Sequence, residues 1–478
     1  MSANQALPRS HPESQGIAAG AIASFLQEIQ DRSLELHSFM LVRHGHVISE
    51  GWWSPYLPKR PHMLFSLSKS FTSTAIGLLA AEGRISLDDR VVSFFPEDVP
   101  DELSSNLSAM TVRHLLMMGT GHAKDASANL HCSDNWVGHI LTLPVEYEPG
   151  THFVYNSGAT YLLSAIIQKV TGITLLDYLG PRLLETLGIV GATWESCPRG
   201  INIGGWGMKI TTEDIAKFGQ LYLQKGQWQG KQLLPEEWVE AATSKQIDNG
   251  SNSNSDWSQG YGYQFWKCRH GAYRGDGAFG QYCIVLPEQD AVIAITSGVN
   301  DMQIVLDVIW ERLLPAMKDE ALPASDKGAV EALDQRLQGL RLESPRMDPS
   351  SSLEAEITGI EYVLEDNEER LRACSFDFND AVITLHIEND RGKHAVYFGR
   401  NEWSEGTYTL HMREANPGFG SATWRDTNTL VLTLRYVETP FCLTVTCTFL
   451  EGTIQLQIKQ NVSFGGGDPN ILTGKARS

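Results

Sequence analysis

A serine and a lysine three residues apart, Ser66 and Lys69, could act as a nucleophile and its base. In Ser66-Leu67-Ser68-Lys69, at the start of a predicted helix, the two side chains would project from one face, one turn apart. The helix dipole favours negative charge in the first turn, and a lysine kept neutral by burial could take the hydroxyl proton. Lys69 is the only lysine with a serine three residues before it. The alternative is that Ser66 merely caps the helix.

A tyrosine and a serine close together, Tyr155 and Ser157, could complete such a site. The phenol could pass a proton to the leaving group, and the Ser157 hydroxyl could hydrogen-bond the lysine or a substrate amide. Of the fourteen tyrosines, Tyr155 alone is followed two positions later by serine or asparagine. The alternative is an ordinary, partly buried tyrosine before a helix N-cap.

These two motifs resemble those of the serine β-lactamase and penicillin-binding-protein-like family. The segment 65–73 is similar to the nucleophile helix of class C β-lactamases and of their esterase and D-aminopeptidase relatives. Further similar segments follow in family order, at 83–89, 111–116, 149–155 and 211–219. The resemblance covers about residues 10–317. It implies an antiparallel sheet flanked by helices plus a helical lobe, with Ser66 as nucleophile, Lys69 as base and Tyr155 as proton shuttle.

The third motif of that family is altered in this sequence. The family carries Lys or His, then Thr or a small residue, then Gly, whereas this chain reads Tyr273-Arg274-Gly275-Asp276-Gly277-Ala278. Aligned on the glycines, Gly275 takes the place of the cation, and Arg274, one position earlier, could partly replace it. Because that cation usually holds the β-lactam carboxylate, its loss argues against efficient β-lactam hydrolysis. Ser157, where β-lactamases usually carry Asn, argues the same way.

The resemblance also places the remaining candidate site residues. The backbone N–H groups of Ser66 and Ala278 would form the oxyanion hole. Gly277 would let the substrate approach the strand closely, and Asp276 is expected to line the site beside it. Trp206 lies in a glycine-rich segment where the family often has a loop near the site, although core packing is the more common role of a tryptophan.

Hydrophobic periodicity places these motifs in an α+β arrangement over residues 1–317. The segment 17–31 is predicted to form a helix, the segment around His44 and His46 a β-hairpin, and 66–82 a second helix. A mainly helical stretch follows to about residue 245, then strand-like runs and a closing helix over 301–317. Because strands come from both ends, we expect one sheet with a helical insertion.

The character of the sequence changes near residue 318. Residues 318–328 are polar and contain proline, which predicts a linker. After one more helix-like stretch, residues 355–463 form short strand-like runs separated by turn residues, so 329–478 is predicted to be a β-sandwich or small barrel. This C-terminal all-β domain could cap the site, mediate dimerisation or bind a small ligand, and the sequence does not choose among these.

The composition argues against several classes of function. With 38 Lys and Arg against 57 Asp and Glu, the formal net charge is −19, which disfavours binding to nucleic acid or to an anionic membrane. No apolar run approaches the roughly 20 residues of a membrane helix, and no signal-peptide pattern stands at the N-terminus. The seven cysteines are scattered without a Cys-x-x-Cys pair, so we expect reduced thiols and a cytoplasmic location.

Together these features predict a serine hydrolase that cleaves an ester or amide through an acyl-enzyme. A small-molecule substrate, neutral or cationic, is expected, with no metal and no cofactor. The altered third motif leaves two alternatives: a β-lactamase of low efficiency, and a non-catalytic ligand-binding protein that keeps the fold. The sequence is also compatible with a homo-oligomer.

Overall fold

The computed structural model describes residues 6–325, 327–409, 415–465 and 468–477. These residues fall into two compact units. The first consists of Met1–Gly51, Pro61–Ser297 and Asp301–Gly339, and the second of Trp52–Arg60, Gly298–Asn300 and Leu340–Ser478.

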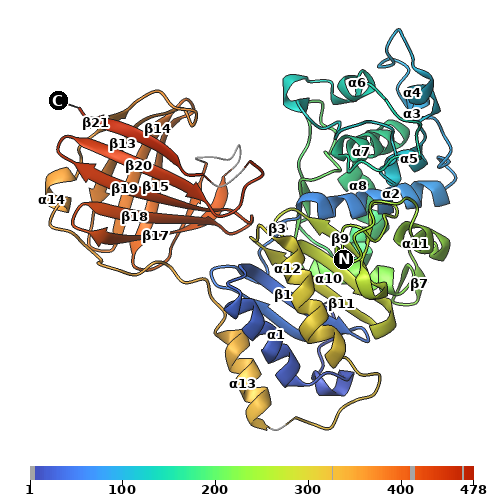
Figure 1. The fold of residues 1–478 in the computed structure, drawn as a ribbon, viewed down its shortest axis with the longest axis horizontal. Helices are drawn as coiled ribbons and strands as arrows, with labels where there is room; N and C mark the ends of the chain where they lie inside the picture. The colour runs from blue at the N-terminus through green and yellow to red at the C-terminus, as the bar shows by residue number, and fades with distance from the viewer. Residues whose placement is uncertain (1–5, 326, 410–414, 466–467, 478) are drawn as a thin grey trace. The chain divides into compact units, whose positions relative to one another are not determined.

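The first unit is built on a six-stranded sheet with the order β2-β1-β11-β10-β9-β8 (Figure 1). The pairings from β1 through β11, β10 and β9 to β8 are antiparallel. N-terminal β1 lies beside β11 from the other end of the unit, as expected for a sheet with a helical insertion. The strands are β1 (Leu36–Arg43), β2 (His46–Trp52), β8 (Trp266–Lys267), β9 (Tyr273–Gly277), β10 (Gln281–Leu286) and β11 (Ala291–Ser297).

Helices cover both faces of this sheet, so β1, β10 and β11 are buried along their whole length. Phe25 of α1 packs on Phe39 of β1 with the ring centroids 4.8 Å apart, and α10 contacts β1, β10 and β11. The predicted helix 17–31 is confirmed as α1, whereas the predicted helix 301–317 continues past α12 as a π-turn and a 3-10 turn. The helices are α1 (Ala19–Asp31), α10 (Thr212–Leu223) and α12 (Met302–Val308).

The helical lobe is inserted between β2 and β8 and is centred on α2 and α7, which pack against each other. A small sheet with the order β3-β5-β4 leads into α2. Its strands are β3 (His62–Met63), β4 (Thr193–Trp194) and β5 (Met208–Ile210). The lobe's helices are α2 (Ser68–Ala81), α3 (Val91–Phe94), α4 (Ser105–Ala109), α5 (Val112–Leu116), α6 (Trp136–Leu141), α7 (Ser157–Thr171), α8 (Leu175–Leu179), α9 (Glu185–Leu187) and α11 (Glu236–Thr243).

Within the described ranges, no helix taken singly has the length and apolar character needed to cross a membrane. One bent pair of helices, Ser157–Thr171 with Leu175–Leu187, meets the length and composition criteria for a membrane span, but its two parts meet at an angle of 69°. The central residues of α7 are buried in the lobe, as is usual for a core helix.

The division between the units lies further along the chain than the expected linker at 318–328. Backbone hydrogen bonds tie this segment to the N-terminal region, from Lys318 N to Gly16 O (2.8 Å) and from Leu322 N to Glu13 O (2.8 Å). Helix α13 (Lys327–Gln338) then packs on α1. The segment is polar because it lies on the surface of the first unit, and the second unit begins at Leu340.

The second unit is a β-barrel, one of the two architectures expected for this part of the chain. Its sheet runs in the order β15-β14-β13-β12-β21-β20-β19-β18-β17-β16, and a parallel pairing of β15 with β17 closes it (Figure 1). The last strand, β21, lies beyond the stretch predicted to hold strands. The strands are β12 (Tyr362–Leu364), β13 (Leu371–Phe378), β14 (Val382–Asn389), β15 (Gly392–Arg400), β16 (Ser404–Tyr408), β17 (Asn416–Asp426), β18 (Thr429–Tyr436), β19 (Cys442–Leu450), β20 (Thr453–Gln460) and β21 (Asn470–Ala476).

The segment Trp52–Arg60 belongs to the barrel unit although it precedes Ser66 by only a few residues. Ser54 N donates to Leu340 O (3.1 Å), and Leu342 N donates to Ser54 O (2.8 Å). The Tyr56 hydroxyl donates to Thr439 O at 3.1 Å. The barrel unit therefore includes chain that leads directly to the candidate nucleophile.

Candidate active site

Ser66 lies in a 3-10 turn, Phe65–Leu67, that continues directly into α2. The i, i+3 spacing therefore brings Lys69, in the first turn of α2, beside it. Lys69 Nζ and Ser66 Oγ are 2.9 Å apart and hydrogen-bonded. The structure thus places the pair as the sequence motif predicts.

Lys69 is buried, with 1% of its surface exposed. Besides Ser66, Nζ contacts the Ser157 hydroxyl at 3.1 Å and the Gly205 carbonyl oxygen at 2.7 Å. Burial lowers the pKa of Lys69 to about 7, although the carboxylates of Asp125 and Asp276 oppose the shift. Near neutral pH a large fraction of this amine is therefore unprotonated and able to accept a proton.

Tyr155 joins this pair from the loop before α7. Lys69 Nζ lies 4.9 Å from the centroid of the Tyr155 ring, and the Ser66 hydroxyl acts on the pKa of the phenol. The ring stacks on Trp266 of β8 at 5.2 Å, which fixes its plane. Burial raises the pKa of Tyr155 well above its usual value, against the opposing effect of the Ser66 hydroxyl, so the phenol keeps its proton and can donate it.

The N-terminus of α7 is fastened by two side chains that hold Ser157 toward Lys69. Asn156 caps the helix, with Oδ1 accepting from Ala159 N at 3.1 Å. Asp125 Oδ1 accepts from the backbone N–H of Ser157 at 2.8 Å, where the helix dipole favours a carboxylate. Asp125 carries no signal in the sequence, because it lies 30 residues before Tyr155 in a polar loop without a motif.

Strand β9 approaches the nucleophile turn closely because it carries glycine at 275 and 277. A Cβ at Gly277 would lie 1.9 Å from Leu64 O, and a Cβ at Gly275 would lie 2.5 Å from Ser70 Oγ. Ala278, the next residue, is therefore held beside the turn that contains Ser66.

Two phenylalanines with left-handed backbone conformation lie where β9 approaches the turn that contains Ser66. Phe65, directly before Ser66, has φ 48°, and Phe279, directly after Ala278, has φ 66°. Their rings meet edge to face at 5.4 Å. Such conformations cost about 1–3 kcal/mol each and gather at functional sites. Sequence reasoning missed both residues, because a positive φ at phenylalanine has no signal in sequence.

Arg274 does not take the place of the missing cation, contrary to the expectation from the third motif. It is fully buried, and its Nε donates to Asp276 Oδ2 at 2.8 Å while Nη1 donates to Asp256 O at 2.8 Å. Its guanidinium also lies over the Trp257 ring at 4.2 Å. Side chains two residues apart on a strand lie on the same face of the sheet. The Arg274 guanidinium is therefore engaged in an ion pair with Asp276. Gly275 leaves no room for a cation, because a side chain there would collide with α2.

Trp206 stands next to Gly205, whose carbonyl oxygen accepts from Lys69. The indole ring of Trp206 lies 6.2 Å from that of Trp136, and its carbonyl oxygen accepts from Trp194 Nε1 at 2.9 Å. The loop around Trp206 therefore holds the lysine through Gly205, a backbone contact that side-chain motifs do not reveal.

A sheet with a helical insertion, and a Ser-Lys-Tyr cluster between them, define the β-lactamase and transpeptidase fold class. Residues 22–304 match the family model described as Beta-lactamase. Because this match spans more than half of the chain, the protein belongs to the β-lactamase family.

Relatives and solved structures agree with this assignment. The chain is 25% identical over 309 residues to the 6-aminohexanoate-dimer hydrolase of Paenarthrobacter ureafaciens, covering 59% of this chain and 78% of that protein. It is also 25% identical over 142 residues to a putative D-alanyl-D-alanine carboxypeptidase of Escherichia coli, covering 27% and 32% of the two chains.

Two solved structures share the fold. The octameric penicillin-binding protein homologue from Pyrococcus abyssi matches with a TM-score of 0.51 and 16% identity, covering 95% of this chain and 99% of that one. A putative 6-aminohexanoate-dimer hydrolase from Bacillus anthracis matches with a TM-score of 0.51 and 21% identity, covering 70% and 86%. The first of these matches extends over both units.

Proposed function

We propose that this chain is a serine hydrolase of the class C β-lactamase-like type that cleaves an ester or amide through an acyl-enzyme on Ser66. The observation that carries the proposal is the buried Lys69, whose pKa of about 7 matches the working range of a general base. It is hydrogen-bonded to the hydroxyl that it would activate. A buried amine without that task would be costly to keep.

The geometry supports the following sequence of proton transfers. Neutral Lys69 Nζ takes the proton of Ser66 Oγ, and the oxygen attacks the substrate carbonyl. The N–H groups of Ser66 and Ala278 stabilise the oxyanion. Tyr155, kept protonated by burial, donates to the leaving group, and the proton held on Lys69 returns to the phenol. Water then attacks the acyl-enzyme with Lys69 again as the base and releases the acid.

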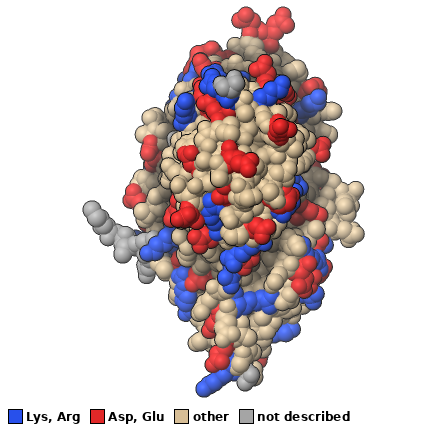
Figure 2. Space-filling model, turned by 90° about the vertical axis from the view of Figure 1, so that its left-hand side faces the viewer, with Lys and Arg blue, Asp and Glu red and all other residues tan. Residues whose placement is uncertain are grey.

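The charges around Lys69 favour a neutral or amine-bearing substrate over a carboxylate. Asp125 and Asp276 act on Lys69, while Arg274 is engaged by Asp276. Figure 2 shows one face of the molecule, on which acidic and basic side chains are interspersed, and the whole chain has a net charge of −19; the two carboxylates near Lys69 are what bear on the charge of the substrate. An anionic β-lactam therefore fits this site less well than an uncharged ester or an ω-amino amide.

The decisive experiment uses a p-nitrophenyl acyl ester and an alkyl fluorophosphonate probe. Wild-type protein should turn over the ester and gain one probe adduct on Ser66 by intact mass. Ser66→Ala should lose at least about 10³-fold in kcat and remain unlabelled. Ser73→Ala is the matched control, because it removes a buried hydroxyl about two turns further along α2, which donates to Tyr263 O, and this variant should keep its activity. Full turnover by Ser66→Ala would refute the proposal.

Substrate charge is tested with two esters that differ only at the far end, one carrying an amine and the other a carboxylate. The amine ester should have the higher kcat/KM, by about tenfold for one favourable charge contact, and Asp276→Asn should reduce this preference. A preference for the carboxylate ester, or efficient hydrolysis of nitrocefin, would favour the β-lactamase alternative. Absence of both labelling and turnover would favour the binding-protein alternative.

A further inference from the structure

Gln264, in the segment that leads into β8, is a buried residue that the proposed mechanism does not use. Only 2% of its surface is exposed, and its φ is 64°. A left-handed backbone at a residue other than glycine costs about 1–3 kcal/mol and persists only where the surroundings fix it. Glycine would adopt this φ without that cost, so the contacts of the glutamine side chain are what distinguish the two residues here.

The side-chain amide of Gln264 joins the C-terminus of α5 to α7. Its Nε2 donates to Leu115 O at 3.1 Å and to Leu116 O at 2.7 Å, two of the carbonyl groups that the end of a helix leaves without a helical partner. Because carbonyl oxygens only accept hydrogen bonds, the NH2 group must face them, which leaves the amide oxygen for α7. There Oε1 accepts from the Thr160 hydroxyl at 2.7 Å.

The backbone of Gln264 is also fastened to α2. Its carbonyl oxygen accepts from the Ser70 hydroxyl at 2.8 Å, and Ser70 follows Lys69 directly. Thr160 lies three residues after Ser157 on α7, so the two are neighbours on the helix surface. Gln264 therefore bridges α2 and α7 close to the contact at which Lys69 Nζ meets the Ser157 hydroxyl at 3.1 Å.

We propose that Gln264 is a positioning residue of the hydrolase site, which holds α7 against α2 so that Ser157 stays in contact with Lys69. This inference rests on the proposed function, because it concerns the same amine and hydroxyl groups. Ser157 begins α7, and Tyr155 stands in the loop directly before that helix, so the position of α7 sets the positions of both. A displacement of about 1 Å at reacting groups can cost about 10²-fold in rate.

The test compares wild type with Thr160→Val, which removes the hydroxyl that binds Gln264, in hydrolysis of a p-nitrophenyl acyl ester. We expect kcat to fall about tenfold and KM to stay within about twofold, because the change acts on proton transfer and not on substrate binding. Thr74→Val is the matched control, because it removes a buried hydroxyl of α2 that contacts the Tyr222 hydroxyl at 2.7 Å. It should lower the unfolding midpoint and leave kcat within about twofold of wild type. No loss of kcat in Thr160→Val, a change confined to KM, or an equal loss in Thr74→Val would overturn the inference.

A double-mutant cycle tests whether Gln264 acts through Thr160. Gln264→Asn keeps an amide and tolerates a left-handed backbone, but it is one methylene group too short to reach both helices. If the two residues act through their shared hydrogen bond, the variant with both changes should lose no more than about twofold in kcat beyond the slower single variant. Losses that multiply would mean that the two residues act separately and would refute the bridge. The result for Thr160→Val decides the proposal by itself where Gln264→Asn does not fold.

Labelling of Ser66 separates failure of this inference from failure of the proposed function. If wild type turns over the ester and the fluorophosphonate probe labels Ser66, the hydrolase assignment stands, and an unchanged kcat in Thr160→Val refutes only the role of Gln264. If wild type shows neither turnover nor labelling, the hydrolase proposal fails, and this inference fails with it.

Discussion

Both units have hydrophobic cores, but the first also buries a lysine amine beside a serine hydroxyl. The first encloses Lys69, Arg274 and Asp276, each held by hydrogen bonds or ion pairs. The core cluster of the barrel consists mainly of leucine, isoleucine and aromatic side chains. Burying a charge is costly unless it is paired, and the cost shifts its pKa toward the neutral form. The first unit therefore holds a buried group that can exchange protons, whereas the core cluster of the barrel consists of hydrophobic side chains.

The largest expected effect comes from removing the buried amine. Lys69→Met should lower kcat/KM for an activated ester by roughly 10²–10⁴-fold, the usual contribution of a general base. The fold should persist, because methionine replaces a buried cation with an apolar side chain of similar length. Stopped assays and thermal unfolding of the same sample check both points. Activity within tenfold of wild type would mean that another group activates Ser66.

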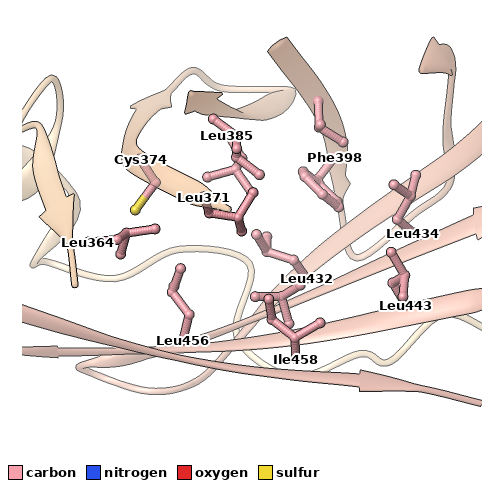
Figure 3. Close-up of a pocket in the computed structure, with 13 residues that line it drawn as sticks. Leu364, Leu371, Cys374, Leu385, Phe398, Leu432, Leu434, Leu443, Leu456 and Ile458 are labelled. Carbon is pink, nitrogen blue, oxygen red and sulfur yellow. The ribbon is translucent and has the colours of Figure 1, made fainter. Parts of the chain in front are cut away.

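A substitution in the barrel should change the stability of the protein and leave its catalytic rate unchanged. Leu432→Ala removes a fully buried side chain, labelled in Figure 3, from the core of the barrel and should destabilise the barrel by about 2–5 kcal/mol, measured as a lower midpoint in denaturant. An unfolding midpoint equal to that of wild type would show that packing around Leu432 does not stabilise the barrel.

The close approach of β9 to the nucleophile turn can be broken with one methyl group. In Gly277→Ala the new Cβ would meet Leu64 O at 1.9 Å, so β9 or the turn must shift. We expect about 1–3 kcal/mol of destabilisation from overpacking and a loss of kcat as Ala278 moves from Ser66. Gly20→Ala on α1, where a Cβ meets nothing within 4 Å, is the control and should not lower the unfolding midpoint.

The smallest expected effect is a shift in pH dependence. Wild-type kcat/KM for an uncharged ester should rise with pH through about 7, because Lys69, with a pKa of about 7, acts only when neutral. Asp125 raises the pKa of Lys69, so Asp125→Asn should move this limb to lower pH, by about one unit at most. Asp101→Asn, in an exposed loop, should leave it in place. A shift to higher pH would contradict the assignment.

Local spacing accounts for what could be predicted of the site. The i, i+3 relation of Ser66 and Lys69 depends only on helical geometry, and it brings the two atoms within 2.9 Å. The short strand-like runs separated by turn residues over 355–463 likewise predicted strands, but a sandwich and a barrel share the same strand pattern. Only the pairing of β15 with β17 distinguishes them.

The sequence by itself determined the nucleophile pair, the tyrosine motif, the α+β order of the first unit and the all-β character of the last. The tertiary structure alone decided how Lys69 is held, through Ser157 and Gly205, which are 88 and 136 residues away. It also decided that Arg274 pairs with Asp276, and that the expected linker is part of the first unit. The physical reason is that periodicity is a local property, whereas partners far apart in the chain are chosen by packing, and packing sets burial, charge and pKa together.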